Sequence, residues 1–415
     1  MSDALSPRVG EGQRDPATCQ NALVADHPIR DDIDLCSGTF WAGDHHESLT
    51  WMRENAPVYF DGNVWGVSRY ADVKEVSRLP EVFSNAGGIR PNQGPLPMMI
   101  DMDDPAHLQR RKLVNRGFTP RRVRDSEPLV RQACTDILDA VIDRGHCDLV
   151  NDVATHLPMI MIGDALGVRP EHRADLLRWS DDMLKGLATE ASDAQLEAAG
   201  NAFVEYTLYA TDVIADRRAD PRDDLMSILV QAEVDGDRLS DEEIIQESLL
   251  ILIGGDETTR HVISGGIHQL LVNREQWDRL AKDSSLRPTA IEEMLRWVTP
   301  IKNMVRTATR DVVLSDQQVR EGDELMLLYP SANRDADVFA DPFTFDSART
   351  PNDHVAFGFG THFCLGASLA RLEISVMLDE LLARVPNLAI ADPDASLVLR
   401  PANFVSGLEE LKVTF

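Results

Sequence analysis

The spacing of apolar and polar residues along this chain predicts a few short strands and many helices. Residues 57–70 form two strand-like apolar runs around a turn at Asp61–Asn63, which is typical of a β-hairpin. Residues 121–215 are mostly helical in pattern, with acidic residues and arginine on the exposed faces. Residues 304–329 are again strand-like, and helical patterns cover residues 288–298 and about 364–384.

The longest helix that the pattern predicts begins at a capping signal. Ser240 is followed three residues later by Glu243, which is the spacing of a capping box, and the apolar pattern then continues over Asp241–Asn273. The chain has no alternation of strand and helix that would predict a parallel sheet. The pattern therefore predicts a mainly α fold with small β-sheets. We expect a flexible tail over residues 1–25 and a single domain over residues 26–415.

Composition excludes several classes of function. The net charge of −28 argues against nucleic acid and anionic membranes as partners. The five cysteines are scattered and show no C-x2-C spacing, so neither a zinc site nor a disulfide framework is expected, and a cytoplasmic location is the simplest interpretation. The N-terminus has no apolar core of a signal peptide, and no apolar stretch approaches the roughly 20 residues that span a bilayer, so no membrane anchor is expected.

Two glycines and several polar residues interrupt the long predicted helix. Gly254 and Gly255 each destabilise a helix interior by roughly 1 kcal/mol relative to alanine, and Asp256, Glu257 and the hydroxyl of Thr258 follow a strongly apolar run. One interpretation is a helix that passes against a flat ligand, with room left by the glycines and protons supplied by the acid and the alcohol. The other is a kinked core helix whose polar residues face solvent.

The stretch FGFGTHFCLG, residues 357–366, places Cys364 among three glycines just before a helix. A nucleotide-binding loop fails because Phe363 occupies the third glycine position. A buried free thiol and a thiolate ligand to haem iron both remain. The thiolate accounts for more residues, because glycines let backbone approach a planar cofactor and a helix N-terminus favours negative charge.

These residues resemble the haem-binding signature of the cytochrome P450 family, F-x-x-G-x-x-x-C-x-G. Phe357, Gly360, Cys364 and Gly366 match its fixed positions. Gly254-Gly255-Asp256-Glu257-Thr258 is similar to the family's central-helix motif, which implies that Glu257 is the acid and Thr258 the alcohol of a proton relay, with Asp256 beside them. The resemblance implies a P450 fold with a helical lobe and a smaller β-rich lobe, with haem b bound through Cys364.

Further residues match the family's pattern for holding the haem. Glu293 and Arg296 fit E-x-x-R, and with Arg349 the resemblance implies a structural ion-pair cluster behind the haem loop. It also implies that the haem propionates bind four residues, His107, Arg111, Arg306 and His362. The family's A-N-R-D-P run is ANRDA here, with Ala336 in place of proline.

The resemblance implies a monooxygenase that receives electrons from ferredoxin and ferredoxin reductase, since no flavin motif is present. Residues 107–124 carry seven lysines or arginines and no acid, and by analogy with the family they form the docking face, with Arg110 and Lys112 on it. A haem protein that binds a ligand without turnover is the other class of function. The acid–alcohol pair argues against it.

The substrate is expected to be large and hydrophobic, because the stretches that form the pocket in this family are apolar here. The expected pocket residues are Ile89, Met98, Met99, Ile253, Met304, Phe404 and Val405. Residues 84–118, 249–261 and 399–409 resemble actinobacterial monooxygenases that oxidise the terminal methyl of the cholesterol or cholest-4-en-3-one side chain. A fatty acid, a terpenoid or a macrolide would suit the same apolar residues.

Overall fold

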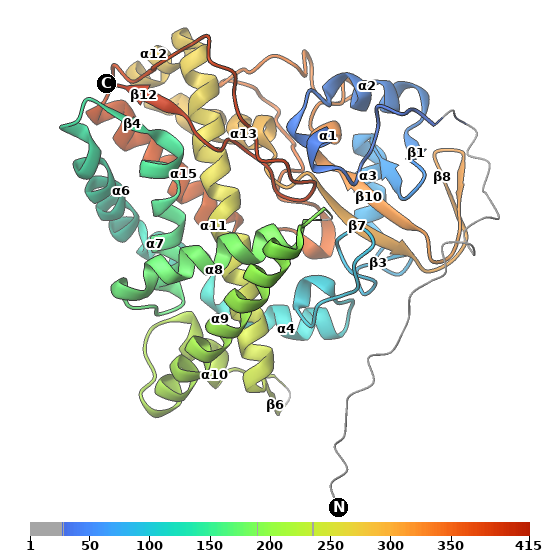
Figure 1. Cartoon of the computed structure of the whole chain (residues 1–415), viewed down its shortest axis with the longest axis horizontal. Helices are drawn as coiled ribbons and strands as arrows, with labels where there is room; N and C mark the ends of the chain where they lie inside the picture. The colour runs from blue at the N-terminus through green and yellow to red at the C-terminus, as the bar shows by residue number, and fades with distance from the viewer. Residues whose placement is uncertain (1–26, 28, 189, 235) are drawn as a thin grey trace, which may run out of the picture.

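The computed structural model describes residue 27 and residues 29–188, 190–234 and 236–415. The predicted tail at residues 1–25 lies outside the described residues. Within them the chain is mainly helical with small sheets, as the sequence predicts. The long helix α11 crosses the middle of the molecule, and the largest sheet lies to one side of it (Figure 1).

That sheet has five strands in the order β1-β2-β10-β7-β3. Its strands are β1 (Val58–Phe60), β2 (Trp65–Val67), β10 (Glu324–Leu328), β7 (Asn303–Ala308) and β3 (Phe83–Ser84). The predicted hairpin is the antiparallel pair β1 and β2, with Val58 opposite Val67. Strand β10 runs parallel to β2 and antiparallel to β7, so the sheet joins segments far apart in sequence.

Three smaller sheets accompany it. One contains β4 (His146–Asp148), β12 (Lys412–Thr414) and β11 (Ala389–Ile390), and the other two are the hairpins β5 (Glu233–Val234) with β6 (Asp237–Arg238) and β8 (Val312–Leu314) with β9 (Gln317–Val319). The strand-like segment 304–329 predicted from the sequence thus becomes four strands of two sheets.

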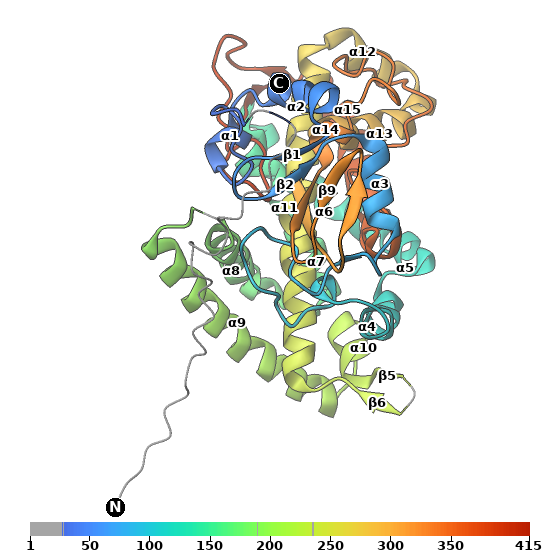
Figure 2. The ribbon, with the colours of Figure 1, turned by 90° about the vertical axis from the view of Figure 1, so that its right-hand side faces the viewer.

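Helix α11 spans Asp241–Val272 and begins at the predicted capping box, in which Ser240 and Glu243 satisfy each other's backbone N–H groups. Figure 2 shows α8 and α9 to one side of α11 and α4 and α10 to the other. The helices before α11 are α1 (Gly38–Ala42), α2 (His46–Asn55), α3 (Tyr70–Arg78), α4 (Ala106–Val114), α5 (Pro120–Asp125), α6 (Glu127–Ile142), α7 (His156–Ala165), α8 (Arg173–Gly186), α9 (Asp193–Ala219) and α10 (Leu225–Gln231). Those after it are α12 (Arg274–Lys282), α13 (Arg287–Val298), α14 (Tyr329–Ala332) and α15 (Ala367–Arg384).

Helix α11 contributes to two separate hydrophobic cores. Its first half places Ile244, Leu249 and Leu252 in a core shared with α8, α9 and α10. Its second half places Val262 and Ile267 in a core shared with α6, α13 and α15. Among the described residues, no helix is long and apolar enough to cross a bilayer.

Candidate active site

A large cavity lies beside the middle of α11 and opens against the segment that precedes α15. Its walls come from α11, α15, β7, the segment 356–366 and residues between Met99 and Phe118. It encloses about 1390 Å³ of space not filled by atoms, counting its open mouth. Its lining is mainly apolar with a few polar side chains, which include His107, Arg111, Arg306 and Thr258, and this combination is typical of a ligand-binding cavity.

Cys364 lines this cavity three residues before Ala367, the first residue of α15. Its backbone N–H donates to the Phe357 carbonyl at 2.9 Å, which closes the loop on itself. Gly360 has a φ of +79°, and a Cβ there would lie 2.3 Å from the carbonyl oxygen of Ser77, so only glycine fits. Gly360 therefore shapes the loop without lining the cavity, whereas Phe357 and Gly366 do line it.

Opposing influences act on the Cys364 thiol. The thiol is exposed toward the cavity but surrounded by protein atoms, and the resulting desolvation raises its pKa, while backbone N–H groups of Gly366 and Ala367 and the charges of Arg111 and Arg371 favour the thiolate. The backbone donors are the free amides of the α15 N-terminus, which is the environment that stabilises a sulfur anion. A metal bound to this sulfur would add the charge that completes the stabilisation.

The four residues expected to hold haem propionates line the same cavity. His107 and Arg111 lie on α4, Arg306 on β7 and His362 before the cysteine, and the rings of His107 and His362 stack with centroids 4.0 Å apart. Burial lowers the pKa of both histidines, and the Asp104 carboxylate, 3.1 Å from Nδ1 of His107, opposes this shift at His107. The Nε2 atom of His107 is buried with no hydrogen-bond partner among the described residues, and an anionic group beside it would favour the protonated ring, which donates from both nitrogens. The residues present fit a haem.

The interrupted part of α11 faces the cavity at Gly254, Gly255, Thr258 and Thr259. A Cβ at Gly254 would meet no atom within 4 Å, so the glycine leaves open space beside the helix. The hydroxyl of Thr258 donates to the Gly254 carbonyl at 3.0 Å. Despite its glycines α11 continues as one helix through this segment.

The two carboxylates of this segment are fully buried and do not line the cavity. Glu257 Oε1 pairs with Arg260 and with Arg400 from the C-terminal loop, while its Oε2 has no partner in the described part of the chain. Neither oxygen of Asp256 has a hydrogen-bond partner there, and burial raises the pKa of this carboxyl to about 7. Arg260, four residues from Asp256, opposes that shift.

The sequence analysis did not identify Arg260 or Arg400 as partners of Glu257. Arg260 stands at i+3 from Glu257 on α11, and this spacing is a usable signal in a helix. Arg400 is separated from Glu257 by 143 residues, and no local pattern reports such a contact.

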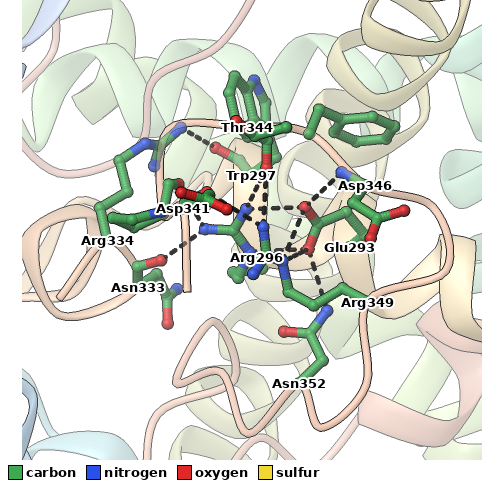
Figure 3. Close-up of polar contacts among 12 residues, drawn as sticks. Glu293, Arg296, Trp297, Asn333, Arg334, Asp341, Thr344, Asp346, Arg349 and Asn352 are labelled. Atoms are coloured by element: carbon green, nitrogen blue, oxygen red, sulfur yellow. Dashed lines mark hydrogen bonds and ion pairs between the residues drawn. The ribbon is translucent and has the colours of Figure 1, made fainter. Parts of the chain in front are cut away.

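Glu293, Arg296 and Arg349 form one buried ion-pair cluster (Figure 3). Arg296 binds both carboxylate oxygens of Glu293 at 2.7 Å, and Arg349 Nε donates to Oε2 at 3.1 Å. Asp346 N and Asn352 Nδ2 complete the donors to Glu293. Arg296 also donates to the carbonyls of Asn333 and Pro342, so the cluster fixes the segment that leads to the cysteine loop.

The expected substrate residues divide into two groups. Met99 and Met304 line the cavity, whereas Ile89, Met98, Ile253, Phe404 and Val405 lie outside its lining. Apolar lining residues that the sequence analysis did not name include Ile100, Phe118, Leu250 and Ile251. Met98 and Met99 are neighbours in a turn, so only one of the two side chains faces the cavity.

The basic segment 107–124 is less free than the sequence suggests. Arg110 pairs with Glu243 at 2.6 Å and with Glu247 at 3.1 Å, and its side chain is only 13% exposed. The expectation that Arg110 belongs to a docking face is therefore wrong, because acidic residues of α11 already neutralise it. Lys112, by contrast, is exposed.

Comparisons with known proteins agree with this geometry. The family model described as Cytochrome P450 matches residues 194–386. The chain is 55% identical over 386 residues to Steroid C26-monooxygenase of Mycobacterium tuberculosis, covering 92% of this chain and 97% of that protein. It is 38% identical to Methyl-branched lipid omega-hydroxylase of Mycobacterium bovis, covering 92% and 95% of the two chains.

Solved structures show the same fold. The crystal structure of CYP109E1 from Bacillus megaterium in complex with testosterone superposes with a TM-score of 0.83 at 35% identity, over 89% of this chain and 97% of that chain. Mycobacterium marinum cytochrome P450 CYP268A2 in complex with pseudoionone gives a TM-score of 0.86 at 34% identity, over 94% and 99%. With a cavity that fits haem behind Cys364 and relatives of this identity along nearly its whole length, the chain belongs to the cytochrome P450 family of haem-thiolate monooxygenases.

Proposed function

We propose that this monooxygenase hydroxylates the terminal methyl group of the side chain of cholest-4-en-3-one or cholesterol. The observation that carries the proposal is the 53–56% identity to three proteins named Steroid C26-monooxygenase, over 88–93% of this chain. The mainly apolar lining of the cavity supports a sterol-sized hydrophobic ligand.

The cofactor would be haem b, with Cys364 as the iron ligand and the arginines and histidines at the cavity edge as partners of the propionates. When bound here, haem supplies the activation of O2 that inserts one oxygen atom into a C–H bond and releases the other as water. The reaction consumes two electrons and two protons. We propose ferredoxin and ferredoxin reductase as the electron source, and residues 26–415 as the single domain that carries out the reaction.

Residues of α11 would deliver the protons that the reaction consumes. Glu257 holds a carboxylate between Arg260 and Arg400, one residue before Thr258, whose hydroxyl lines the cavity. We propose that Thr258 passes protons into the cavity and that Glu257 resupplies it, directly or through water. Thr258 must first release the Gly254 carbonyl, to which it donates here.

A second candidate is the terminal hydroxylation of a methyl-branched lipid, and the 38% identity to a protein named for that activity supports it. In both candidate reactions the hydroxylated atom belongs to a terminal methyl group on a long apolar chain, so the cavity alone does not distinguish the two substrates. The cytoplasmic location expected from the scattered cysteines stays a prediction.

The test uses the purified holoprotein. Dithionite reduction under carbon monoxide should give the strongly red-shifted Soret band of a thiolate ligand, and Cys364→His should abolish it. Titration with cholest-4-en-3-one should shift the oxidised haem from low to high spin. Turnover with ferredoxin and reductase should then yield a product with one added oxygen at the terminal methyl. If only a branched fatty acid gives a response, the second candidate replaces the first. If neither ligand gives a response, both candidates are overturned.

A further inference from the structure

The segment between β3 and α4 forms a closed loop that supplies one wall of the cavity, at Met99 and Ile100. Asp101 determines its shape. The carboxylate of Asp101 accepts from Ile89 N at 3.1 Å, from Leu96 N at 2.7 Å and from Arg90 Nη2 at 2.9 Å. We call residues 89–101 the closed loop. Both partners of its Arg90–Asp101 ion pair are buried, so we treat the loop as one rigid piece.

The closed loop is attached to the sheet at its beginning and to α11 at its end. Val305 N on β7 donates to the Ile89 carbonyl at 2.9 Å. At the other end Met99 N donates to Glu247 Oε1 at 2.8 Å, a contact between residues 148 positions apart. This hydrogen bond links the cavity wall directly to α11, and Met98 and Met99 also pack in the hydrophobic core that contains the first half of α11.

The Oε1 atom of Glu247 also accepts a hydrogen bond from a residue of α4. Arg110 of α4 donates through Nη1 to Glu247 Oε1 at 3.1 Å and to the Pro97 carbonyl of the closed loop at 3.3 Å. Glu247 is fully buried, and its Oε2 has no partner among the described residues. A buried carboxylate is unfavourable unless its contacts are needed, and its contacts here are the loop amide and the arginine that braces the loop.

The position of Glu247 on α11 explains why these contacts bear on the cavity. Glu247 lies one turn before Leu250 and Ile251, which line the cavity, yet Glu247 itself does not line it. It lies about three turns, or about 16 Å of helix rise, before Thr258. Glu247 therefore acts on the wall of the cavity and is remote from the residues assigned to proton transfer.

We propose that Glu247 is a positioning residue for the substrate: it fixes the Met99–Ile100 wall against α11 and thereby sets how tightly the hydrophobic substrate fits. The inference rests on the proposed function only for the choice of a sterol as the ligand. A residue with this role affects substrate affinity and leaves the chemical step unchanged.

The decisive variant is Glu247→Met, which keeps the length of the side chain and removes both the acceptor and the charge. In the holoenzyme, the dissociation constant for cholest-4-en-3-one, read from the spin-state shift, should rise about tenfold or more, with KM following it and kcat changed by less than about twofold. Hydrogen–deuterium exchange of the peptide that contains Met99 should become about tenfold faster without substrate. Glu247→Gln, whose amide oxygen can still accept from Met99 N, should restore both values to within about threefold of the wild type.

Glu243→Gln is the matched control. Glu243 binds the same Arg110 at 2.6 Å, is 38% exposed and does not contact Met99. In this variant the amide oxygen of the introduced glutamine can preserve the capping contact with Ser240 N. Affinity and Met99 exchange should both stay within about twofold of the wild type.

Several outcomes would overturn the inference. Unchanged affinity and exchange in Glu247→Met would mean that the carboxylate does not hold the wall. A lower melting temperature with unchanged affinity would leave only a structural role, and a loss of kcat at constant affinity would place Glu247 in the chemistry. If Glu247→Met fails to fold, Glu247→Ala takes its place with the same criteria. If the wild type shows no response to the sterol, the proposed function fails, while the exchange measurement still tests the hold on Met99.

Discussion

The ion-pair cluster around Glu293 and the carboxylates in the middle of α11 are both buried, and they differ in how completely their carboxylate oxygens are paired. Around Glu293, both carboxylate oxygens bind Arg296 at 2.7 Å and receive further donors from Arg349, Asp346 and Asn352. In the middle of α11, Asp256 has no hydrogen-bond partner on either oxygen among the described residues, and Glu257 has a partner on one oxygen only.

The difference agrees with the roles proposed for the two groups, a structural one around Glu293 and a functional one in α11. A fully paired buried network fixes one conformation, and removing any member leaves an uncompensated charge. An incompletely paired one is tolerated where water, substrate or a proton has to pass. The first group lies behind the cysteine loop and anchors it, and the second borders the cavity at Thr258.

Replacing Arg296 by methionine should give the largest effect. Glu293 would remain buried without its main partner, so the free energy of unfolding should fall by about 3–5 kcal/mol. Denaturant titration followed by circular dichroism measures it. Arg371→Met is the matched control, because Arg371 is 37% exposed and its partner Glu292 is 29% exposed, and its loss should amount to at most about 1 kcal/mol. Equal losses in the two variants would remove the distinction between the clusters.

Thr258→Ala should change catalysis and leave stability nearly constant. Loss of the hydroxyl should lower the fraction of electrons recovered as product by about tenfold or more, while reductant consumption continues. Product formed per reductant consumed measures this coupling. Thr259→Ala removes the neighbouring hydroxyl, which also lines the cavity, and should leave coupling intact. Uncoupling by Thr259→Ala alone would transfer the role to Thr259.

The smallest expected effect is a change in the pH dependence of stability. Burial raises the pKa of Asp256 to about 7, with Glu257 and Asp181 adding to the shift and Arg260 opposing it. The folded state then keeps a proton that the unfolded state loses near pH 4. Asp256 therefore lowers the free energy of unfolding as pH rises from about 4 to about 7, and its own contribution to the slope is up to about 1.4 kcal/mol per pH unit.

Asp256→Asn should flatten this slope, measured by denaturant titrations at a series of pH values across that range. Asp125→Asn, at a side chain that is 68% exposed, should leave the slope as in the wild type. If the slope persists in Asp256→Asn, it is caused by other buried carboxyl groups, such as Glu373, whose pKa burial raises to about 8.

Local patterns in the sequence predicted the fold class and most of the frame of the site. The capping box at Ser240 located the start of α11, and the loop of Cys364 was recognisable because ten consecutive residues match one signature, in which Gly360 is required by its positive φ. Contacts between distant segments were not predictable in this way. Arg400 reaches Glu257 and Glu247 reaches Met99 only because the chain folds back, and neither contact leaves a periodic signal.

The pocket shows the same limit. The resemblance to the family predicted that Ile89, Met98 and Met99 approach the cavity, but which of these side chains line it depends on turn geometry. Met99 and Ile100 belong to a 3-10 turn that presents them to the cavity, whereas Ile89 is turned away and buried at 1% exposure. Composition reports that a segment is apolar and does not report the direction of its side chains.

The division of α11 between two hydrophobic cores has a consequence for folding. The Gly254–Gly255 pair falls at the boundary, with Leu252 packed in one core and Val262 in the other. Each half of the helix gains its stability from a different set of partners, and segments with different partners can unfold separately. Unfolding of the first half alone would unwind α11 as far as the glycines, and residues 254–259 would then lose the helical turns that precede them.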